Sequence, residues 1–454
     1  MEKINEGVFK AYDIRGIYPT EIDEDFAYKL GRSYATFVLE KNPAATSVVL
    51  SSDMRLSSPA LRTEVERGLL DSGLNIVDIG LASTPTFYFA VAYYGYDAGI
   101  QVSASHNPKD YNGFKMVLKG SFPVSKNSGI LRIKEIMLSE EFANKGEKGV
   151  IFKEDHVLED LASEQLVSFD ISKIKKFKIV IDAANAMGAL DMDNFFKHIP
   201  ADIIKINFKL DGSFPSHEAD PMKEENIALL KEEVVKNGAD FGIAIDGDAD
   251  RYFFVDEKGE ALKPEILLAI MAQIELRKEA GSVICYDVRS GKTPLDIITE
   301  MKGDPILTPV GHSLIKEIMI ENGAVFGGES SGHYYYQEHY GTFEMPFIFL
   351  ANFMQFLSSE EKTFSEMTGS YDKYCSSGEI NRKVADQKAV LEKIKQKYAD
   401  GRISEIDGIS VEYPDFWFNV RTSNTEPLVR LNLESRDSTI TEDKVKEVLA
   451  VIEE

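Results

Sequence analysis

The sequence predicts a multi-domain protein of the α/β class. Short apolar runs typical of buried strands alternate with capped, amphipathic segments typical of helices along most of the chain. A chain of 454 residues is too long for one hydrophobic core, and its length corresponds to three or four domains. The sequence becomes charged and aperiodic between residues 139 and 160, and its composition changes again near residue 362. We place the domains at residues 1–149, 150–251, 252–362 and 363–454.

The overall charge argues against several classes of partner. A formal net charge of −24 argues against nucleic acid and against an anionic membrane surface, because both attract a basic face. The only cysteines are Cys285 and Cys375, so no disulfide framework is expected and a reducing, cytoplasmic location is favoured. The N-terminus has no apolar signal region, and the longest apolar run, Met345–Leu357, is too short to cross a bilayer.

The first unit shows the alternation of strands and helices most clearly. Ser58 and Pro59 suit the cap and first turn of a helix that extends to Leu70. The other expected elements are strands at 47–50, 75–79 and 98–103 and a helix at 85–94. Ser51–Arg55 forms the loop after the first of these strands.

A serine follows the last of these strands. Ser105 stands at the strand end, and Asn107-Pro108 bars a helix and forces a turn. A serine on such a loop, beside His106 and with Lys115 opening the next strand, suits an exposed nucleophile or phosphate carrier. A well-satisfied polar turn accounts for the same residues equally well. The residues alone leave both interpretations open.

Three aspartates at alternate positions follow a buried strand of the second unit. The expected elements of this unit are strands at 178–181, 203–206 and 241–245 and a helix at 225–236. Asp246, Asp248 and Asp250 share the next loop, and converging carboxylates suit a hard divalent cation. A calcium EF-hand is excluded because Arg251 stands where that loop needs glycine and because strands flank it. A purely structural Asp-Gly turn is the alternative.

The third unit contains two patterns that imitate catalytic motifs. Its expected elements are a hairpin at 252–260, helices at 264–278, 294–301 and 313–321, and strands at 283–288 and 306–307. Gly291-Lys292-Thr293 resembles the end of a nucleotide-binding P-loop, but Tyr286 occupies the position of its first glycine. Residues 328–332 fit the nucleophile elbow of α/β-hydrolases, but the histidines that follow are too close in the chain. We expect neither motif to act.

A polar loop joins two strands of the fourth unit. Val411–Val420 and Leu428–Leu433 alternate in the manner of strands, and a helix is expected at 441–452. The loop between the strands offers a guanidinium, hydroxyls, an amide and main-chain N–H groups, which together suit a phosphate. As a bare turn it would carry no function.

Five motifs, in this order along the chain, resemble those of the α-D-phosphohexomutases. They are Ala104-Ser105-His106-Asn107-Pro108 with Tyr111-Asn112-Gly113-Phe114-Lys115, Asp246-Gly247-Asp248-Ala249-Asp250-Arg251, Val310-Gly311-His312, Gly327-Gly328-Glu329-Ser330-Ser331-Gly332-His333, and Arg421-Thr422-Ser423-Asn424-Thr425. The family includes phosphomannomutases, phosphoglucomutases and phosphoglucosamine mutases, and the resemblance spans nearly the whole chain. It implies three similar mixed α/β domains and a C-terminal α+β domain around a central active-site cleft.

The resemblance also implies a reaction and a set of site residues. Phosphorylated Ser105 exchanges a phosphoryl group with a hexose 6-phosphate or 1-phosphate through a hexose 1,6-bisphosphate, which also acts as primer. Mg²⁺ is held by Ser105, Asp246, Asp248 and Asp250. Catalysis is expected from Arg15, Ser105, His106, Lys115 and His333. Substrate binding is expected from Tyr12, Arg251, Arg289, His312, Glu329, Ser331, Arg421, Ser423, Asn424, Thr425 and Arg430.

Some of these residues suit ordinary structural roles equally well, and others depart from the family pattern. Asp13 and Arg15 would otherwise form an ordinary surface pair, and Glu329 would be an ordinary loop carboxylate. Many relatives carry lysine at the position of Arg289, and we give Arg289 only a phosphate-binding role because arginine is a poor base at pH 7. Ser52 replaces the usual glycine of the family's Gly-x-Asp-x-Arg loop.

Mannose and glucose phosphates are the expected substrates. Glu329 and Ser331 are expected to bind the 3- and 4-hydroxyls, which exchange places when the sugar turns end over end. Because mannose and glucose differ only at C2, we expect a mutase that prefers mannose phosphate and also turns over glucose phosphate, within roughly a hundredfold. Phosphoglucosamine mutase is the alternative within the family. A non-catalytic sugar-phosphate sensor and a phosphatase are the alternatives from other classes.

Overall fold

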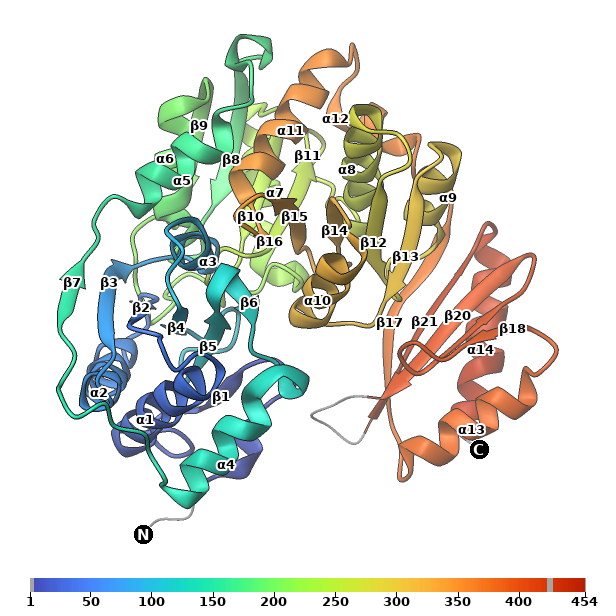
Figure 1. Cartoon of the computed structure of the whole chain (residues 1–454). Helices are drawn as coiled ribbons and strands as arrows, with labels where there is room; N and C mark the ends of the chain where they lie inside the picture. The colour runs from blue at the N-terminus through green and yellow to red at the C-terminus, as the bar shows by residue number, and fades with distance from the viewer. Residues whose placement is uncertain (1–3, 423–427, 454) are drawn as a thin grey trace. The chain divides into compact units, whose positions relative to one another are not determined.

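The computed structural model describes residues 4–422 and 428–453 (Figure 1). The chain divides into two compact units. One unit contains Met1–Leu262 with Ser331–Ser365, and the other contains Lys263–Ser330 with Glu366–Glu454. Helices and β-sheets combine in both units, in agreement with the α/β class expected from the sequence.

The first sheet lies in the unit that contains the N-terminal half of the chain. Its strand order is β1-β5-β4-β2-β3-β7, with β6 beside β5. The strands are β1 (Ile14–Ile17), β2 (Ser47–Ser52), β3 (Asn75–Leu81), β4 (Ala98–Val102), β5 (Tyr111–Leu118), β6 (Phe122–Pro123) and β7 (Ile151–Lys153). The helices are α1 (Glu24–Lys41), α2 (Ser58–Asp71), α3 (Thr84–Tyr93) and α4 (Leu131–Ser139). Because β2 and β4 are parallel neighbours, the loops that carry Arg55 and Ser105 leave the same edge of the sheet.

Helices α1 and α2 pack on this sheet. Tyr34 of α1, Leu61 of α2 and Ile100 of β4 belong to one buried hydrophobic cluster. The Tyr34 hydroxyl lies 2.9 Å from the Gly99 carbonyl and 2.6 Å from the Val117 carbonyl, so its one hydrogen has an acceptor inside the core.

The second sheet has the strand order β11-β10-β8-β9. Its strands are β8 (Phe177–Asp182), β9 (Ala201–Ile206), β10 (Phe241–Ile245) and β11 (Tyr252–Asp256), and its helices are α5 (Val157–Leu166), α6 (Gly188–His198) and α7 (Glu224–Asn237). β11 pairs with β10, so the strand expected to open the domain at residues 252–362 belongs to the second sheet. Likewise β7, which follows the charged stretch before residue 150, pairs with β3 of the first sheet. Pairing partners, which no local pattern specifies, decide both positions.

The longest apolar run of the chain forms a buried helix. The run lies almost entirely in α11 (Pro346–Ser359), which follows β15 (Tyr334–Glu338) and β16 (Gly341–Glu344). Phe349 of α11 stacks on Tyr334 at a ring distance of 4.4 Å, and Phe353 lies 4.8 Å from Phe254 of β11. α11 thus packs against the second sheet. Among the residues that the structure describes, no helix has the length and apolarity of a membrane span.

The other unit begins with parallel strands and ends with an antiparallel sheet. The first part contains α8 (Pro264–Lys278), β12 (Val283–Asp287), α9 (Lys292–Glu300), β13 (Asp304–Thr308), α10 (His312–Asn322) and β14 (Phe326–Gly328), and β12 pairs with both β13 and β14 in parallel. The short helix α12 (Phe364–Gly369) follows later in the chain.

The antiparallel sheet has the order β17-β21-β20-β19-β18. Its elements are β17 (Cys375–Lys383), α13 (Gln387–Lys397), β18 (Arg402–Ser404), β19 (Ile409–Glu412), β20 (Phe416–Thr422), β21 (Leu428–Ser435) and α14 (Ser438–Glu453). The single strand expected at Val411–Val420 is wrong. A turn closed by a hydrogen bond from the Tyr413 N–H to the Phe416 carbonyl, at 2.9 Å, separates β19 from β20, and Pro414 and Asp415 favour that turn.

Candidate active site

Ser105 follows β4, and its side chain is enclosed. The residue is 1% exposed, its hydroxyl donates to Asp246 Oδ2 at 2.9 Å, and its φ of 50° lies in the left-handed region. The expectation of an exposed loop is therefore wrong. The aspartate loop that follows β10 covers the serine, and only a tertiary contact between two sheets could reveal this.

His106 is the second neighbour of the serine hydroxyl. Its Nδ1 lies 3.2 Å from Ser105 Oγ. Burial lowers the pKa of His106 well below its usual value, and the guanidiniums of Arg251 and Arg15 lower it further. The neutral imidazole is therefore favoured. The serine hydroxyl has one hydrogen, which points to Asp246 Oδ2, and Nδ1 can accept it when the hydroxyl turns toward His106.

The three aspartates after β10 converge as their spacing predicts. All are buried, and ligand atoms of Asp246, Asp248 and Asp250 lie within 4.8 Å of one another. Burial, followed by repulsion from Asp248 and Asp250, raises the pKa of Asp246 well above its usual value. Three close carboxylates in one buried loop need a cation nearby.

Lys115 is the protein's own cation in this centre. It lies in the middle of β5, not at the start of the strand as expected, and is 3% exposed. Its Nζ lies 2.6 Å from Asp248 Oδ2 and 2.7 Å from Asp250 Oδ2. Burial disfavours the ammonium, but the two carboxylates outweigh that effect and raise the pKa of Lys115 well above its usual value. Lys115 therefore stays charged, which argues against its use as a base.

The donor set of the aspartate loop fits a hard divalent cation. Asp248 Oδ2 accepts a hydrogen bond from Thr84 Oγ1 at 2.6 Å in addition to its contact with Lys115. Asp248 Oδ1 is buried and has no hydrogen-bond partner among the described residues. Because leaving a buried carboxylate oxygen unpaired is costly, a purely structural turn accounts poorly for it, whereas Mg²⁺ prefers such oxygen ligands.

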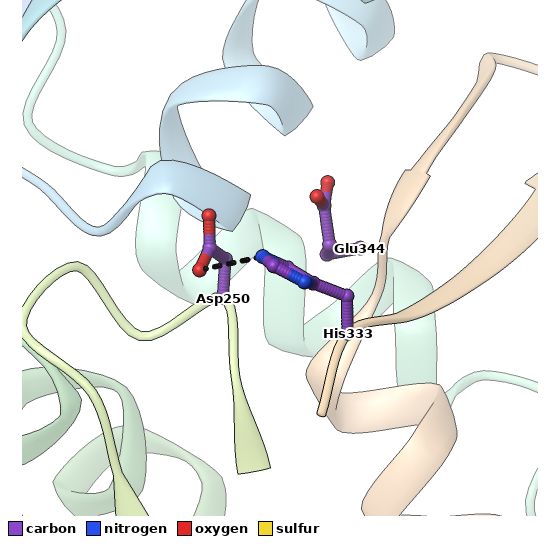
Figure 2. A group of neighbouring side chains, drawn as sticks. All are labelled: Asp250, His333 and Glu344. Atoms are coloured by element: carbon purple, nitrogen blue, oxygen red, sulfur yellow. Dashed lines mark ion pairs between the residues drawn. The ribbon is translucent and has the colours of Figure 1, made fainter. Parts of the chain in front are cut away.

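A second group of potential ligands adjoins the first. Asp250, His333 and Glu344 are all buried, and Figure 2 shows the His333 imidazole turned toward Asp250, with Glu344 beside it. His333 Nε2 lies 3.3 Å from Asp250 Oδ1, and it also accepts a hydrogen bond from Arg251 Nε at 3.2 Å. Its Nδ1 lies 2.9 Å from Ser331 Oγ. Since Nε2 already faces a guanidinium, we assign the cation to the three aspartates and not to this group.

Two arginines border the serine and the aspartates. Arg15 Nε donates to Asp13 Oδ2 at 2.6 Å, and its Nη1 reaches Asn107 of the Ser105 loop. Asp13 is 2% exposed, so the two residues are not a surface pair. Arg251 Nε lies 3.8 Å from Asp246 Oδ2. Tyr12, expected to bind substrate, is half-buried just before β1.

The other unit holds the remaining expected residues, beginning with Arg289 and Glu329. Arg289 follows β12 and donates from Nε and Nη2 to Asp287 Oδ2 at 2.8 and 2.6 Å. Its Nη2 lies 3.6 Å from Glu329 Oε1, which accepts a hydrogen bond from the Gly311 N–H at 2.9 Å. Glu329 is 1% exposed, so it is not an ordinary loop carboxylate. His312 is buried at the start of α10.

Arg421 and Arg430 face each other across β20 and β21. Both reach Glu379 of β17, at 2.5 Å from Arg421 Nη2 and 3.0 Å from Arg430 Nη1. Among the described residues, the buried Nε atoms of both arginines have no partner. Burial, followed by the charge of Arg289, lowers the pKa of Arg421. Because two guanidiniums share the one carboxylate of Glu379, this pair carries more positive charge than Glu379 balances. Ser423, Asn424 and Thr425 lie outside the described residues.

Arg55 and Glu379 make several contacts in these surroundings and are not among the site residues expected from the sequence. Arg55 donates to four main-chain carbonyls of the Ser105 loop. The sequence offered a signal for Arg55, because the pattern Asp53-x-Arg55 directly follows the strand expected at 47–50. Glu379 has no comparable signal, because β17 is too polar and exposed to be predicted as a strand.

Family comparison covers nearly the whole chain in four consecutive parts. Phosphoglucomutase/phosphomannomutase alpha/beta/alpha domain I matches residues 6–144, domain II matches 156–259, domain III matches 263–374, and the C-terminal domain matches 379–451. The chain belongs to the phosphoglucomutase/phosphomannomutase family.

Related proteins agree over their full lengths. The chain is 37% identical to a phosphomannomutase of Vibrio cholerae, covering 98% of each protein. It is 38% identical to a phosphomannomutase of Methanocaldococcus jannaschii, covering 98% of this chain and 97% of that protein. A crystal structure of a phosphoglucomutase/phosphomannomutase family protein from Burkholderia thailandensis matches with a TM-score of 0.91 at 29% identity, covering 99% of this chain and 98% of that one.

The protein is therefore a phosphohexomutase, an isomerase that acts on hexose phosphates, with the four-domain α/β architecture of this family. Phosphohexomutases use Mg²⁺, and the three aspartates after β10 offer a matching ligand set.

Proposed function

We propose that this phosphohexomutase interconverts hexose 6-phosphates and hexose 1-phosphates through a phosphoserine at Ser105 and an enzyme-bound hexose 1,6-bisphosphate. The observation that carries the proposal is the hydrogen bond from Ser105 Oγ to Asp246, because it joins the candidate carrier to the candidate metal ligands. A phosphoryl group on Ser105 would meet the cation at this point.

The reaction consists of two phosphoryl transfers, the first from Ser105 to the sugar and the second from the sugar back to Ser105. In the first, a hexose hydroxyl attacks the phosphorus of phosphorylated Ser105 and passes its proton to a base. The bond from phosphorus to Ser105 Oγ breaks, and Oγ takes up a proton to become the serine hydroxyl, with His106 Nδ1 as the adjacent donor. In the second, the Ser105 hydroxyl attacks the other phosphate of the bisphosphate and loses its proton. The bond from that phosphorus to the sugar oxygen breaks, and the sugar oxygen takes up a proton. The protein is phosphorylated again, and the sugar leaves with its remaining phosphate at the other end.

The surroundings of Ser105 suggest how these steps are assisted. His106 Nδ1, 3.2 Å from Ser105 Oγ and neutral, is the candidate base for the serine hydroxyl. His333 is the candidate base for the sugar hydroxyl, since Lys115 stays charged. Lys115 and Arg251, with Arg15, supply positive charge to the transferred group. Bound Mg²⁺ would neutralise phosphoryl oxygens.

The residues of the other unit suit the part of the substrate that does not react. Arg421 and Arg430 share one carboxylate, and their Nε atoms have no partner within residues 4–422 and 428–453, which favours binding of the other phosphate. Ser423, Asn424 and Thr425 are further expected ligands. Arg289 and His312 are proposed as additional phosphate ligands. Glu329, with Ser331 and Tyr12, is proposed to bind the sugar.

Mannose phosphate is the preferred substrate in this proposal, and glucose phosphate is also used. Binding at the 3- and 4-hydroxyls serves both orientations of the intermediate but does not distinguish mannose from glucose, which differ at C2. The related phosphomannomutases of Vibrio cholerae and Methanocaldococcus jannaschii support mannose. They do not favour the alternative of a phosphoglucosamine mutase.

A coupled assay tests the proposal directly. Purified protein is given Mg²⁺, a bisphosphate primer, and mannose 1-phosphate, glucose 1-phosphate or glucosamine 1-phosphate. We expect mannose and glucose phosphates to be turned over with kcat/KM values within roughly a hundredfold of each other. Inert mannose 1-phosphate beside active glucosamine 1-phosphate would overturn the substrate assignment. Release of inorganic phosphate in step with loss of substrate would show a phosphatase instead.

A further inference from the structure

Arg55 binds the main chain of the Ser105 loop. The residue lies in the loop after β2, and its side chain is 0% exposed. Its Nη2 donates to the carbonyls of Ser105 at 2.7 Å and Asn107 at 2.5 Å. Its Nη1 donates to the carbonyls of Pro108 at 2.8 Å and Tyr111 at 3.0 Å. One guanidinium therefore joins four carbonyls of a single loop.

An ion pair and an aromatic ring contact the rest of the Arg55 side chain. Its Nε lies 3.3 Å from Asp53 Oδ2, and Asp53 Oδ1 accepts hydrogen bonds from the Arg55 N–H at 3.0 Å and from Ser58 Oγ at 2.6 Å. The Phe214 ring covers the guanidinium, with its centroid 5.0 Å from the central carbon. The buried charge is thus paired with Asp53, and hydrogen bonds to acceptors come from Nη1 and Nη2, because the contact of Nε is an ion pair without hydrogen-bond geometry.

These contacts act on the main chain that sets the direction of the serine hydroxyl. Ser105 has a φ of 50°, a conformation that a residue with a side chain keeps only when its surroundings enforce it. Its carbonyl lies between Arg55 and the aspartate loop, where a Cβ on Gly247 would come within 2.3 Å of it. If the main chain at Ser105 left this conformation, Ser105 Oγ would lose its 2.9 Å contact with Asp246.

We propose that Arg55 is a positioning residue, which holds the Ser105 main chain in its left-handed conformation so that Oγ points at the aspartates. Lysine cannot replace it, because three donors on a flexible stem cannot satisfy four carbonyls in a fixed plane. The inference rests on the proposed function of Ser105 as the phosphoryl carrier. A misplacement of about 1 Å at a reacting atom costs on the order of a hundredfold in rate.

The test compares Arg55→Lys and Arg55→Ala with the same substitutions at Arg32. Arg32 of α1 is a half-buried arginine of the same unit, whose side chain donates hydrogen bonds to Ser72, Tyr28 and Ala143. Each variant is checked for folding by circular dichroism, for kcat and KM with mannose 1-phosphate, and for phosphate on Ser105 by intact mass after incubation with glucose 1,6-bisphosphate.

We expect folded Arg55→Lys to lose at least about thirtyfold in kcat, with KM within about threefold of the wild type and little phosphate on Ser105. Guanidinium chloride at millimolar concentration should restore part of the kcat of Arg55→Ala. Both Arg32 variants should keep kcat and KM within about threefold.

Three results would overturn the proposal. The first is a kcat of Arg55→Lys within threefold of the wild type, and the second is an equal loss of kcat in the Arg32 and Arg55 variants. The third is failure of Arg55→Lys to fold, which would make Arg55 a general folding residue. An inactive wild-type protein would instead refute the proposed function, so the two failures are distinguishable.

Discussion

Two regions of the molecule carry surplus charge of opposite sign. The first, the Ser105 centre, consists of Ser105, Lys115 and the three aspartates after β10, and the second is the pair of Arg421 and Arg430 in the antiparallel sheet. Around Ser105, the three buried aspartates outnumber the two cations that each reach two of them, Lys115 at 2.6 and 2.7 Å and Arg251 at 3.8 and 3.9 Å. In the other unit, Arg421 and Arg430 share the single carboxylate of Glu379. Each region therefore has an excess of charge that is opposite in sign to the ligand we expect there, a divalent cation in one and a phosphate in the other.

The two regions also assemble their charges differently. The aspartates and Ser105 follow strands of two separate sheets, β10 and β4, so the first region depends on how those sheets pack. Arg421 and Arg430 lie directly opposite each other on neighbouring strands, so the second region depends on strand register. Like charges in such a pair repel, which explains why Glu379 lies within reach of both. Substitutions in the first region should change chemistry, and those in the second should change substrate binding.

The largest effect is expected for Ser105→Ala. Removal of the phosphoryl carrier should lower kcat by at least about a thousandfold, because a covalent step is lost. The protein should still fold, since only one buried hydroxyl is removed. Steady-state kinetics and intact mass measure the two consequences, and a loss below tenfold would refute Ser105 as the carrier.

A large effect is also expected for Asp248→Asn. A neutral amide is a poorer ligand for a hard cation, so Mg²⁺ affinity and kcat should fall together, kcat by on the order of a hundredfold. Asp182→Asn is the matched control, because Asp182 is 2% exposed at the end of the neighbouring strand β8. Titration of activity with Mg²⁺ measures the difference. An unchanged Mg²⁺ dependence of Asp248→Asn would exclude this loop as the metal site.

A smaller and different effect is expected for Arg421→Met. Losing a charge-assisted hydrogen bond to phosphate, worth about 1.5–3 kcal/mol, should raise KM by roughly ten- to a hundredfold and change kcat less. Arg382→Met serves as control, since Arg382 of β17 pairs instead with Glu453 at 2.8 Å. If kcat fell and KM stayed constant, the division of roles between the two regions would be wrong.

The smallest effect concerns a charge pair outside both regions. Burial opposes the charged form of His217, but its hydrogen bonds to Asp182 and to the Glu218 carbonyl outweigh this and raise its pKa. A raised pKa stabilises the fold fully below the unfolded value of about 6.5, and the contribution is lost as pH rises through the folded pKa. His217→Asn should lower Tm by roughly 1–3 °C more at pH 5.5 than at pH 8.5. An equal shift at both values would exclude the charged pair.

Local patterns determined much of the fold. Helix α8 and strand β10 have the bounds that their apolar residues predict, because burial of side chains at regular spacing is a local property of the chain. Helix α1 is not predicted although its Asp23 cap and apolar face are present. Strands β1, β7 and β17 have no such signal, since each is short or largely exposed.

The candidate site divides in the same way. Ser105 at a strand end and the alternating aspartates could be found by reading the sequence, because both depend on residues adjacent in the chain. Only the tertiary structure decided that Ser105 is buried against Asp246, that Lys115 reaches two aspartates from mid-strand, and that Arg55 holds the serine loop. Each of these contacts joins residues that are at least fifty positions apart in the chain or lie on different sheets. Sheet packing sets their distances, and no short stretch of sequence encodes it.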